Sequence, residues 1–319
     1  MAKKTKIHES SIRCVVVESD ETSIFCGSSD RGISRTDAER CRVSWRAKEA
    51  HSAAVNCVHH NAISLCSGDD EGCVKCWDVR SSKSIVEFPT VCQDYVSAIG
   101  GNPVRPNELL LTSGDGTICI LDQRTNKILA KSDDQEDELL AFSFIKEGSK
   151  VVVGTQEGAL LIFSQGRWQD QSDRFPGHPD SVNAVVAIDE DTVLTGAGDG
   201  LIRLVSVQPN RLLGIVGDHD DFPIETLRTS TDRRRLGSSS HDNSIKIWDI
   251  AYFWDDAEEE DAESNSTTAT ARVSKKRDAP EAASLSETVT KERGKKGDGG
   301  LASGRSKKRQ RQADFFAGL

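Results

Sequence analysis

One short pattern recurs six times along this chain of 319 residues: an acidic residue followed by a short apolar stretch. The acids are Asp30, Glu71, Asp115, Glu157, Asp199 and Asp242, and successive acids lie 41, 44, 42, 42 and 43 residues apart. A period of this length, kept over six copies, indicates one supersecondary unit that is repeated along the chain. The fold must therefore be one in which similar units pack against one another.

Each copy contains signals for short strands. The acid begins a pair such as Asp-Gly, Glu-Gly or Asp-Asn, which tolerates positive φ and reverses the chain tightly between two strands. The apolar residues on either side of this turn are expected to pair as antiparallel strands. The segments lack a period of 3.6 residues, so stacked helices are disfavoured and each copy predicts about four short strands.

The two clearest copies are similar to the WD repeat, whose copies form the blades of a β-propeller. They read Glu71-Gly-Cys-Val-Lys-Cys-Trp77-Asp78 and Asp242-Asn-Ser-Ile-Lys-Ile-Trp248-Asp249. The resemblance implies one hydrogen-bonded set made by His219, Ser240, Asp242 and Trp248. In the other copies Thr36, Leu121, Phe163 and Val205 replace the Trp, so apolar packing is expected to hold those blades. We interpret all these residues as structural, because a buried His and Asp satisfy each other in this way.

Composition divides the chain into a propeller at 1–254 and a tail at 255–319. The tail opens with seven acids within 255–263, and residues 264–319 then carry thirteen Lys or Arg against six Asp or Glu. Such a segment buries too little apolar surface to offset its ordering entropy, so it is predicted to be disordered. The tail is neutral as a whole, which assigns the net charge of −10 to the propeller. An acidic propeller is a poor general binder of phosphate backbones.

The basic clusters of the tail, between 272 and 311, predict nuclear or nucleolar targeting, and the alternative is that they serve general solubility or weak RNA contact. The residues expected to carry the targeting signal are Lys275, Lys276, Arg277, Lys307, Lys308, Arg309 and Arg311. The last six residues, 314–319, form the one apolar cluster of the tail and predict a docking motif made by Phe315, Phe316 and Leu319. The sequence shows no secretory signal and no stretch long enough to span a membrane, so an intracellular protein is expected.

The sequence offers little sign of catalysis or of a metal. Nine cysteines are present, and Cys73 and Cys76 have the spacing of a zinc pair. Both lie on one predicted strand, however, where residues three apart point to opposite faces, so one ion cannot bind both. The common nucleotide-binding, hydrolase and metalloprotease motifs are missing. We expect no metal, no cofactor and no enzymatic activity; a hydrolase or isomerase with an active site in the central funnel is the least favoured alternative.

Several segments together are similar to the WD repeat-containing protein 55 family, whose fungal members are called Jip-five proteins. They are the stretch from Gln208 to His219, Ser172-Asp-Arg-Phe175, the turn Ser239-Ser-His-Asp242 with the strand that follows, and Asp314-Phe-Phe-Ala-Gly-Leu319. The resemblance covers nearly all of 10–254. It implies a nuclear, largely nucleolar scaffold in ribosomal RNA processing and large ribosomal subunit assembly, with pre-ribosomal assembly factors as partners.

The chain departs from this family in one respect. Its members have an additional repeat upstream, which makes seven, whereas only about ten residues precede the first copy here. Either the sequence begins late or the blades form an open or six-membered ring. Propellers often close when an N-terminal strand completes the last blade, and Thr5 to Glu9 is the candidate segment for that strand.

A second class of function remains open on the sequence. Trp77-Asp78-Val79-Arg80, and more weakly Leu121-Asp122-Gln123-Arg124, resemble the WDxR box of propellers that serve as substrate receptors of cullin–RING ubiquitin ligases. Arg80 and Arg124 would then contact a ligase adaptor through charge-assisted hydrogen bonds on an exposed rim. The simpler interpretation is that each Arg pairs with an acid of its own blade.

Overall fold

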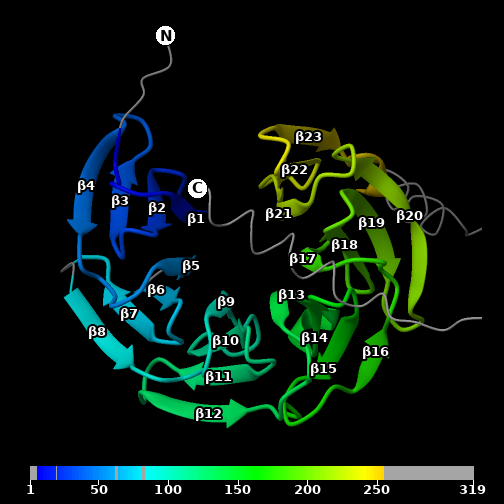
Figure 1. Cartoon of the computed structure of the whole chain (residues 1–319), viewed down its shortest axis with the longest axis horizontal. Coiled ribbons are helices and arrows are strands. Elements are labelled where there is room, and N and C mark those ends of the chain that lie inside the picture. Colours follow the sequence, from blue (N-terminus) through cyan, green and yellow to red (C-terminus); the bar gives the residue numbers. More distant parts are fainter. Residues whose placement is uncertain (1–5, 19, 62–63, 81–82, 255–319) are drawn as a thin grey trace, which may run out of the picture. The chain divides into compact units, whose positions relative to one another are not determined.

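The computed structural model describes residues 6–18, 20–61, 64–80 and 83–254. In these ranges the chain forms six antiparallel sheets that follow one another around a common centre (Figure 1). The first five sheets have four strands each and the sixth has three. The fold is therefore a six-bladed β-propeller, and the predicted all-β class is confirmed.

Each blade is built from consecutive strands, the first nearest the centre and the last at the rim (Figure 1). Blade 1 contains β1 (Ile12–Val17), β2 (Ser23–Ser28), β3 (Ile33–Asp37) and β4 (Arg42–Ala47); blade 2 contains β5 (Val55–His60), β6 (Ser64–Asp69), β7 (Val74–Asp78) and β8 (Lys83–Phe88); blade 3 contains β9 (Val96–Gly101), β10 (Glu108–Ser113), β11 (Ile118–Asp122) and β12 (Lys127–Lys131). Blade 4 contains β13 (Leu139–Ile145), β14 (Lys150–Thr155), β15 (Leu160–Ser164) and β16 (Asp173–Phe175); blade 5 contains β17 (Val182–Ala187), β18 (Thr192–Ala197), β19 (Leu201–Ser206) and β20 (Arg211–Asp218); blade 6 contains β21 (Ile224–Thr229), β22 (Arg235–Ser240) and β23 (Ile245–Asp249).

Helical structure is sparse in the described residues. It consists of the 3-10 turn η1 (Lys146–Gly148) and one turn at 252–254. None of the described helical segments has the length and apolar character of a membrane span.

The six acids of the repeat all lie in the turn between the second and third strands of their blades. In every copy the residue after the acid adopts positive φ. The value is 60° at Asn243 and 75° to 87° at Gly72, Gly116, Gly158 and Gly200, as the sequence pattern predicts, and 66° at Arg31, which the pattern does not cover. Gly72 is also required by space, because a Cβ there would lie 2.3 Å from the carbonyl oxygen of Cys92. Arg31 is the one long side chain at this position of the six repeat turns.

The core lies between neighbouring blades rather than inside any one of them. Val74 on the third strand of blade 2, for example, belongs to the same buried cluster as Leu109 and Leu111 on the second strand of blade 3. The same arrangement repeats from blade 1 to blade 6, and each cluster joins residues of two successive blades. A blade therefore buries its apolar surface only when the next blade is present.

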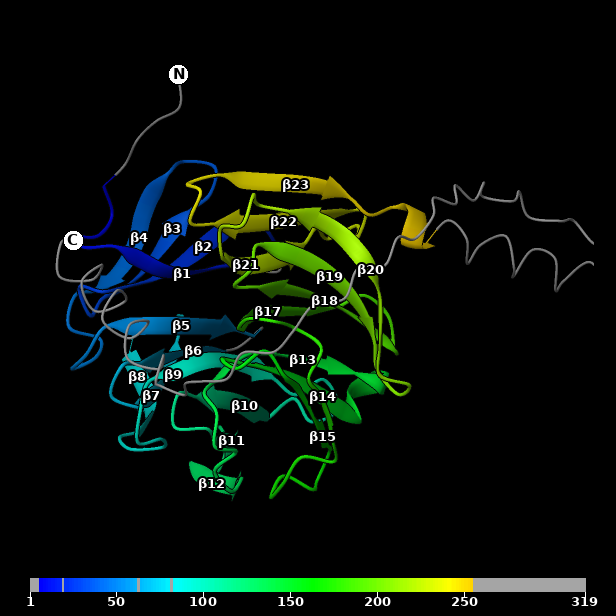
Figure 2. The ribbon, with the colours of Figure 1, turned by 45° about the vertical axis from the view of Figure 1, so that its right-hand side comes forward.

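The segment from Lys6 to Glu9 belongs to blade 1 and does not complete blade 6. His8 Nδ1 lies 3.0 Å from Asp30 Oδ1, and the backbone N–H of Glu9 donates to Asp30 Oδ2 over 2.8 Å. The prediction that Thr5 to Glu9 forms the closing strand is thus wrong for Lys6 to Glu9, because these bonds anchor the segment to blade 1; Thr5 lies outside the described residues. Within the described residues blade 6 has three strands, β21, β22 and β23, which Figure 2 shows.

Candidate interaction surface

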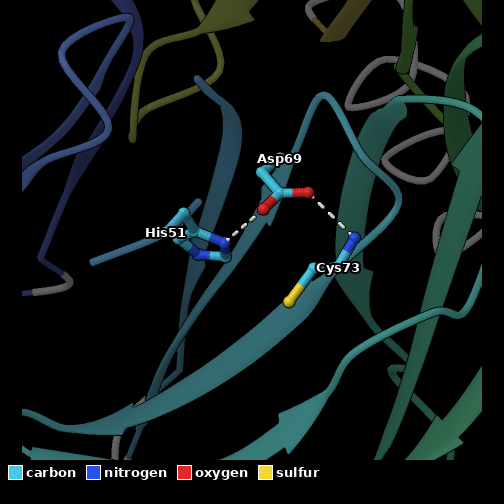
Figure 3. A group of neighbouring side chains, drawn as sticks. All are labelled: His51, Asp69 and Cys73. Carbon is cyan, nitrogen blue, oxygen red and sulfur yellow. Dashed lines mark hydrogen bonds and ion pairs between the residues drawn. The ribbon is translucent and has the colours of Figure 1, made fainter. Parts of the chain in front are cut away.

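A buried chain of hydrogen bonds fixes the turn of blade 2. Asp69 is an acceptor and takes a hydrogen bond from His51 Nδ1 over 2.9 Å. The other ring nitrogen of His51 then accepts from the Ser67 hydroxyl (2.6 Å), and the Ser67 oxygen accepts from Trp77 Nε1–H (2.9 Å). The side chains of His51 and Asp69 have no exposed surface. Figure 3 shows both residues beside Cys73.

The acid in this network is Asp69, two residues before the Glu71 of the repeat pattern. Asp69 also accepts the backbone N–H groups of Glu71 and Cys73, at 3.0 and 2.9 Å. Burial by itself would raise the pKa of Asp69, but the hydrogen bonds from His51 and Cys73 outweigh it and hold that pKa below its usual value. Glu71 is exposed and accepts a hydrogen bond from the Ser52 hydroxyl over 3.0 Å.

Blade 6 forms the same network with one change from the sequence prediction. His219 Nδ1 lies 2.8 Å from Asp242 Oδ2, and this bond lowers the pKa of Asp242 to about 2. The hydroxyl between His219 and Trp248 belongs to Ser238, at 2.6 and 2.8 Å, and the prediction of Ser240 is wrong. Ser238 and Ser240 lie on the same face of β22 but about 7 Å apart along the strand, so only one of them can meet the histidine. The Ser240 hydroxyl donates instead to the Phe222 carbonyl over 3.1 Å.

Blade 1 has a related network that the sequence pattern does not reveal. His8 is 4% exposed and connects Asp30 with the Ser34 hydroxyl, which lies 2.8 Å from His8 Nε2. Arg46 also bonds to Asp30 over 3.0 Å. The network thus exists although Thr36 replaces the Trp. The available signal was the position of His8 a few residues before the first strand, as for His51 and His219.

Apolar packing replaces the Trp in the remaining three blades, as predicted. Leu121, Phe163 and Val205 have no exposed surface and belong to the clusters between blades. Blade 5 adds a charged pair, in which the Arg203 guanidinium donates to both carboxylate oxygens of Asp199 at 2.9 and 2.6 Å.

His51, Asp69 and Cys73 have ligand atoms close enough together to surround one metal ion. Their bonding argues for a structural role. Both ring nitrogens of His51 are engaged, and burial raises the pKa of the Cys73 thiol to about 12, so a thiolate is disfavoured. Cys76 does not join the group, because its sulfur lies 2.9 Å from that of Cys66 on the neighbouring strand.

The two arginines of the WDxR boxes are exposed in the turns between third and fourth strands, Arg80 after β7 and Arg124 after β11. In each case the carboxylate of the preceding Asp accepts the backbone N–H of the Arg, over 2.9 Å from Asp78 and 2.8 Å from Asp122. Strand direction alternates within a blade, so both turns lie at the opposite end of the strands from the acidic repeat turns.

The ends of the strands that carry the repeat turns form a strongly acidic surface, which we call the acidic loop face. It comprises the second-to-third strand turns and the links between blades. In its loops the exposed acids are Glu9, Glu49, Glu71, Asp94, Asp133, Asp134, Glu136, Glu138, Glu157, Asp180, Asp220 and Asp221, and the exposed Lys and Arg residues are Lys6, Arg31 and Lys48. Exposed Arg13 and Lys131 reach this face from strands and contact Asp70 and Asp115. The acids are densest between β12 and β13, where they line a hollow of about 300 Å³.

The opposite face carries both signs of charge. Its exposed arginines include Arg40, Arg80, Arg105, Arg124, Arg167, Arg233 and Arg234, and its exposed acids include Asp20, Glu39, Asp170, Asp189, Glu190 and Asp232. The negative charge that the sequence assigns to the propeller is therefore concentrated at one end of the blades. Because opposite charges attract, the acidic loop face suits basic partners and repels phosphate backbones.

A cavity of about 1100 Å³ lies along the first strands, at the centre of the blades. Polar side chains meet at its mouth: Arg13 contacts Asp70 at 2.9 Å, and Asn56 Nδ2 donates to Asp70 over 2.5 Å. Tyr95 also lines the cavity and donates its hydroxyl to Glu138 over 3.0 Å, and burial raises the pKa of Tyr95. These residues connect the cavity to the acidic loop face.

The predicted targeting residues from Lys275 to Arg311 and the docking motif of Phe315, Phe316 and Leu319 lie outside the described residues. They stay predictions of the sequence.

Comparison with known proteins agrees with the repeat and the fold. A family model described as WDR55 matches residues 1–253, which include all six blades. The chain belongs to the WDR55 family. It is 39% identical to WD repeat-containing protein 55 of Arabidopsis thaliana over 252 residues, 78% of this chain and 70% of the relative. It is 39% identical over 230 residues to WD repeat-containing protein JIP5 of Cryptococcus neoformans (71% of this chain, 60% of the relative), and 33% identical over 247 residues to WD repeat-containing protein 55 of Mus musculus (76% and 62%).

The chain spans about 60 to 70% of the length of these relatives. Propellers of WD repeats generally mediate contacts between proteins. In this member of the WDR55 family, the loops of the acidic loop face carry twelve exposed acids against three exposed Lys or Arg residues, which makes this face the main candidate for such contacts.

Proposed function

We propose that this WDR55 family member is a non-catalytic scaffold of ribosome biogenesis in the nucleolus, acting in ribosomal RNA processing and large subunit assembly. Its acidic loop face binds basic segments of pre-ribosomal assembly factors. The observation that carries the proposal is the one-sided charge of the propeller, because a surface rich in Asp and Glu selects basic protein segments over nucleic acid. The family resemblance supports the process and the compartment.

The tail has a separate part in this proposal. Its basic clusters, outside the described residues, deliver the chain to the nucleus and add weak contact with RNA. Protein contact and nuclear delivery are thereby assigned to different parts of the chain, which allows each to be tested alone.

Imaging of a tagged copy tests the compartment. We expect nucleolar signal from the full chain and diffuse signal when 264–319 is deleted, because the deletion removes the basic clusters. Diffuse cytoplasmic signal from the full chain contradicts the proposal.

Purification of the full chain should also recover precursor ribosomal RNA and assembly factors to the same extent from wild type and from Arg80→Ala. Loss of that recovery in Arg80→Ala, with recovery of a cullin adaptor by wild type alone, favours the ligase-receptor class instead.

A further inference from the structure

One aromatic side chain is exposed in the loops of the acidic loop face. Among the described residues two aromatic side chains are about half open to solvent, Phe222 at 48% and Tyr252 at 50%. Tyr252 lies in the helical turn after β23, at the other end of the blades. Phe222 lies in the link between β20 and β21, directly after the exposed Asp220 and Asp221. The acidic loop face thus presents one aromatic ring among its acids.

The ring of Phe222 has no stacking partner in the part of the chain that the structure describes. The aromatic pairs and the contacts between cations and rings there all involve other rings. Lys246, the basic side chain beside this link, is already engaged. Its Nζ donates to the Asp218 carbonyl over 2.9 Å and lies 6.0 Å from the centre of the Trp248 ring. The Phe222 ring is therefore open to a cation from a partner.

The turn that carries Phe222 is held on both sides. The backbone N–H of Phe222 donates to the His219 carbonyl over 3.0 Å, and its carbonyl accepts from the Ser240 hydroxyl over 3.1 Å. His219 is fully buried and is fixed by Asp242. The turn also packs closely on the repeat turn of blade 5, where a Cβ at Gly200 would lie 3.0 Å from the Phe222 backbone nitrogen. Binding at this ring therefore costs little free energy for ordering of the turn.

Carboxylates surround the same place. The side chain of Asp220 is 82% exposed, and the exposed Asp221 next to it forms no ion pair within the described residues. Asp180, also exposed, approaches the blade 5 turn from its other end, where a Cβ at Gly198 would lie 3.0 Å from Asp180 Cγ. Acids thus lie on both sides of the turn on which Phe222 packs.

Arginine is the residue that fits an aromatic ring beside carboxylates. Its guanidinium is planar, stacks on the face of a ring and donates in a fork to a carboxylate, whereas the ammonium of lysine is a compact, strongly hydrated charge. The acids attract both residues through their charge. The ring therefore supplies a preference between them that the acids alone do not.

We propose that Phe222 is the anchor at which the acidic loop face recognises an arginine in the basic segment of a partner. The guanidinium stacks on the ring, and the basic residues that flank this arginine meet Asp180, Asp220 and Asp221. The inference rests on the proposed function, because it takes the basic segment assigned to this face and adds the residue that selects among such segments.

Fluorescence polarisation with the full chain and two labelled peptides tests the anchor; one peptide alternates Arg and Gly, and the other alternates Lys and Gly. We expect wild type to bind the arginine peptide about threefold to tenfold more tightly than the lysine peptide. Phe222→Ala should remove most of this difference. Phe222→Leu should remove it as well, because Leu keeps apolar surface without an aromatic face, whereas Phe222→Trp should retain it.

Tyr252→Ala is the matched control, since Tyr252 is exposed to the same extent at the other end of the blades and its loss should leave both affinities unchanged. Both side chains are half exposed, so these variants should fold as the wild type does. NMR spectra of the arginine peptide give a second measurement. The CH2 protons next to the guanidinium should shift upfield on binding to wild type but not to Phe222→Leu, because an aromatic ring shields protons above its face.

Equal affinity of wild type and Phe222→Ala for the arginine peptide overturns the inference. If the triple variant Asp134→Asn, Glu136→Gln, Glu157→Gln then weakens binding of both peptides, the acidic loop face binds basic segments through charge alone, and the proposed function stands without the anchor. Absence of saturable binding of either peptide to wild type contradicts the role of the face itself, and so the inference and the proposed function together.

Discussion

Replacement of Asp69 by Ala should lower the free energy of unfolding by about 3–5 kcal/mol, one of the two largest effects that we expect in this chain. Asp69 is fully buried and accepts hydrogen bonds from the His51 ring and from the backbone N–H groups of Glu71 and Cys73. The Ala variant leaves all three donors buried without an acceptor. Each N–H donor that loses its acceptor costs the free energy of removing that group from water, which the hydrogen bond had offset. The three costs fall in one turn and add up.

Urea unfolding followed by tryptophan fluorescence measures this effect, and the chain offers a matched control. Glu71→Ala removes the acid two residues further along the same turn, but Glu71 is exposed, so the change should stay within about 0.5 kcal/mol. Asp69→Asn should fall between the two variants, because its amide oxygen can still accept backbone N–H bonds. Equal losses from Asp69→Ala and Glu71→Ala would show that the buried network does not fix the blade.

Phe163→Ala should destabilise the propeller by a similar amount, about 3–5 kcal/mol. Phe163 occupies the position of the repeat Trp in blade 4, has no exposed surface and packs with Val151, Val153 and Leu161. No hydrogen bond of this side chain is lost, so the cost comes from lost apolar contacts and from the cavity that remains.

Phe222→Ala is the matched control, since it removes the same side chain from a loop where Phe222 is 48% exposed. We expect a loss of less than about 1 kcal/mol, again by urea unfolding. A Phe163→Ala variant as stable as Phe222→Ala would mean that the packing between blades 4 and 3 is not what holds the Trp-free blades together.

The fold could be predicted from the sequence because its period and its turns are local signals. The spacing of the acids predicted six repeated units but left the number of blades open, and the Asp-Gly, Glu-Gly and Asp-Asn pairs predicted positive φ in their turns. The positive φ of Arg31 was not part of that pattern. The partners inside each turn were harder to predict. Ser238 and Ser240 are equally good hydrogen-bonding residues on the same face of β22, and the choice between them depends on which position along the strand lies opposite His219.

The surfaces could be predicted only in part. Net charge and its assignment to the propeller follow from counting, but the concentration of acids at one end of the blades requires knowledge of which loops share a face. The exposure of Ile245 and Ile247 on β23 is a still less local property. Ile245 and Ile247 have the apolar character of their buried counterparts, so only the arrangement of the blades shows that they are exposed.

Carboxylate-to-lysine coupling in native assemblies, read by mass spectrometry, tests the central claim most directly. A zero-length reagent joins an Asp or Glu to a Lys only where the two are in contact. With the tagged full chain purified together with its partners, we expect partner lysines coupled to Asp134, Glu136 and Glu157 of the acidic loop face, and few coupled to Glu39, Asp189 and Glu190 of the opposite face. Couplings that favour the opposite face, or that are spread evenly over both, would contradict the assignment of the acidic loop face as the surface through which this propeller binds its partners.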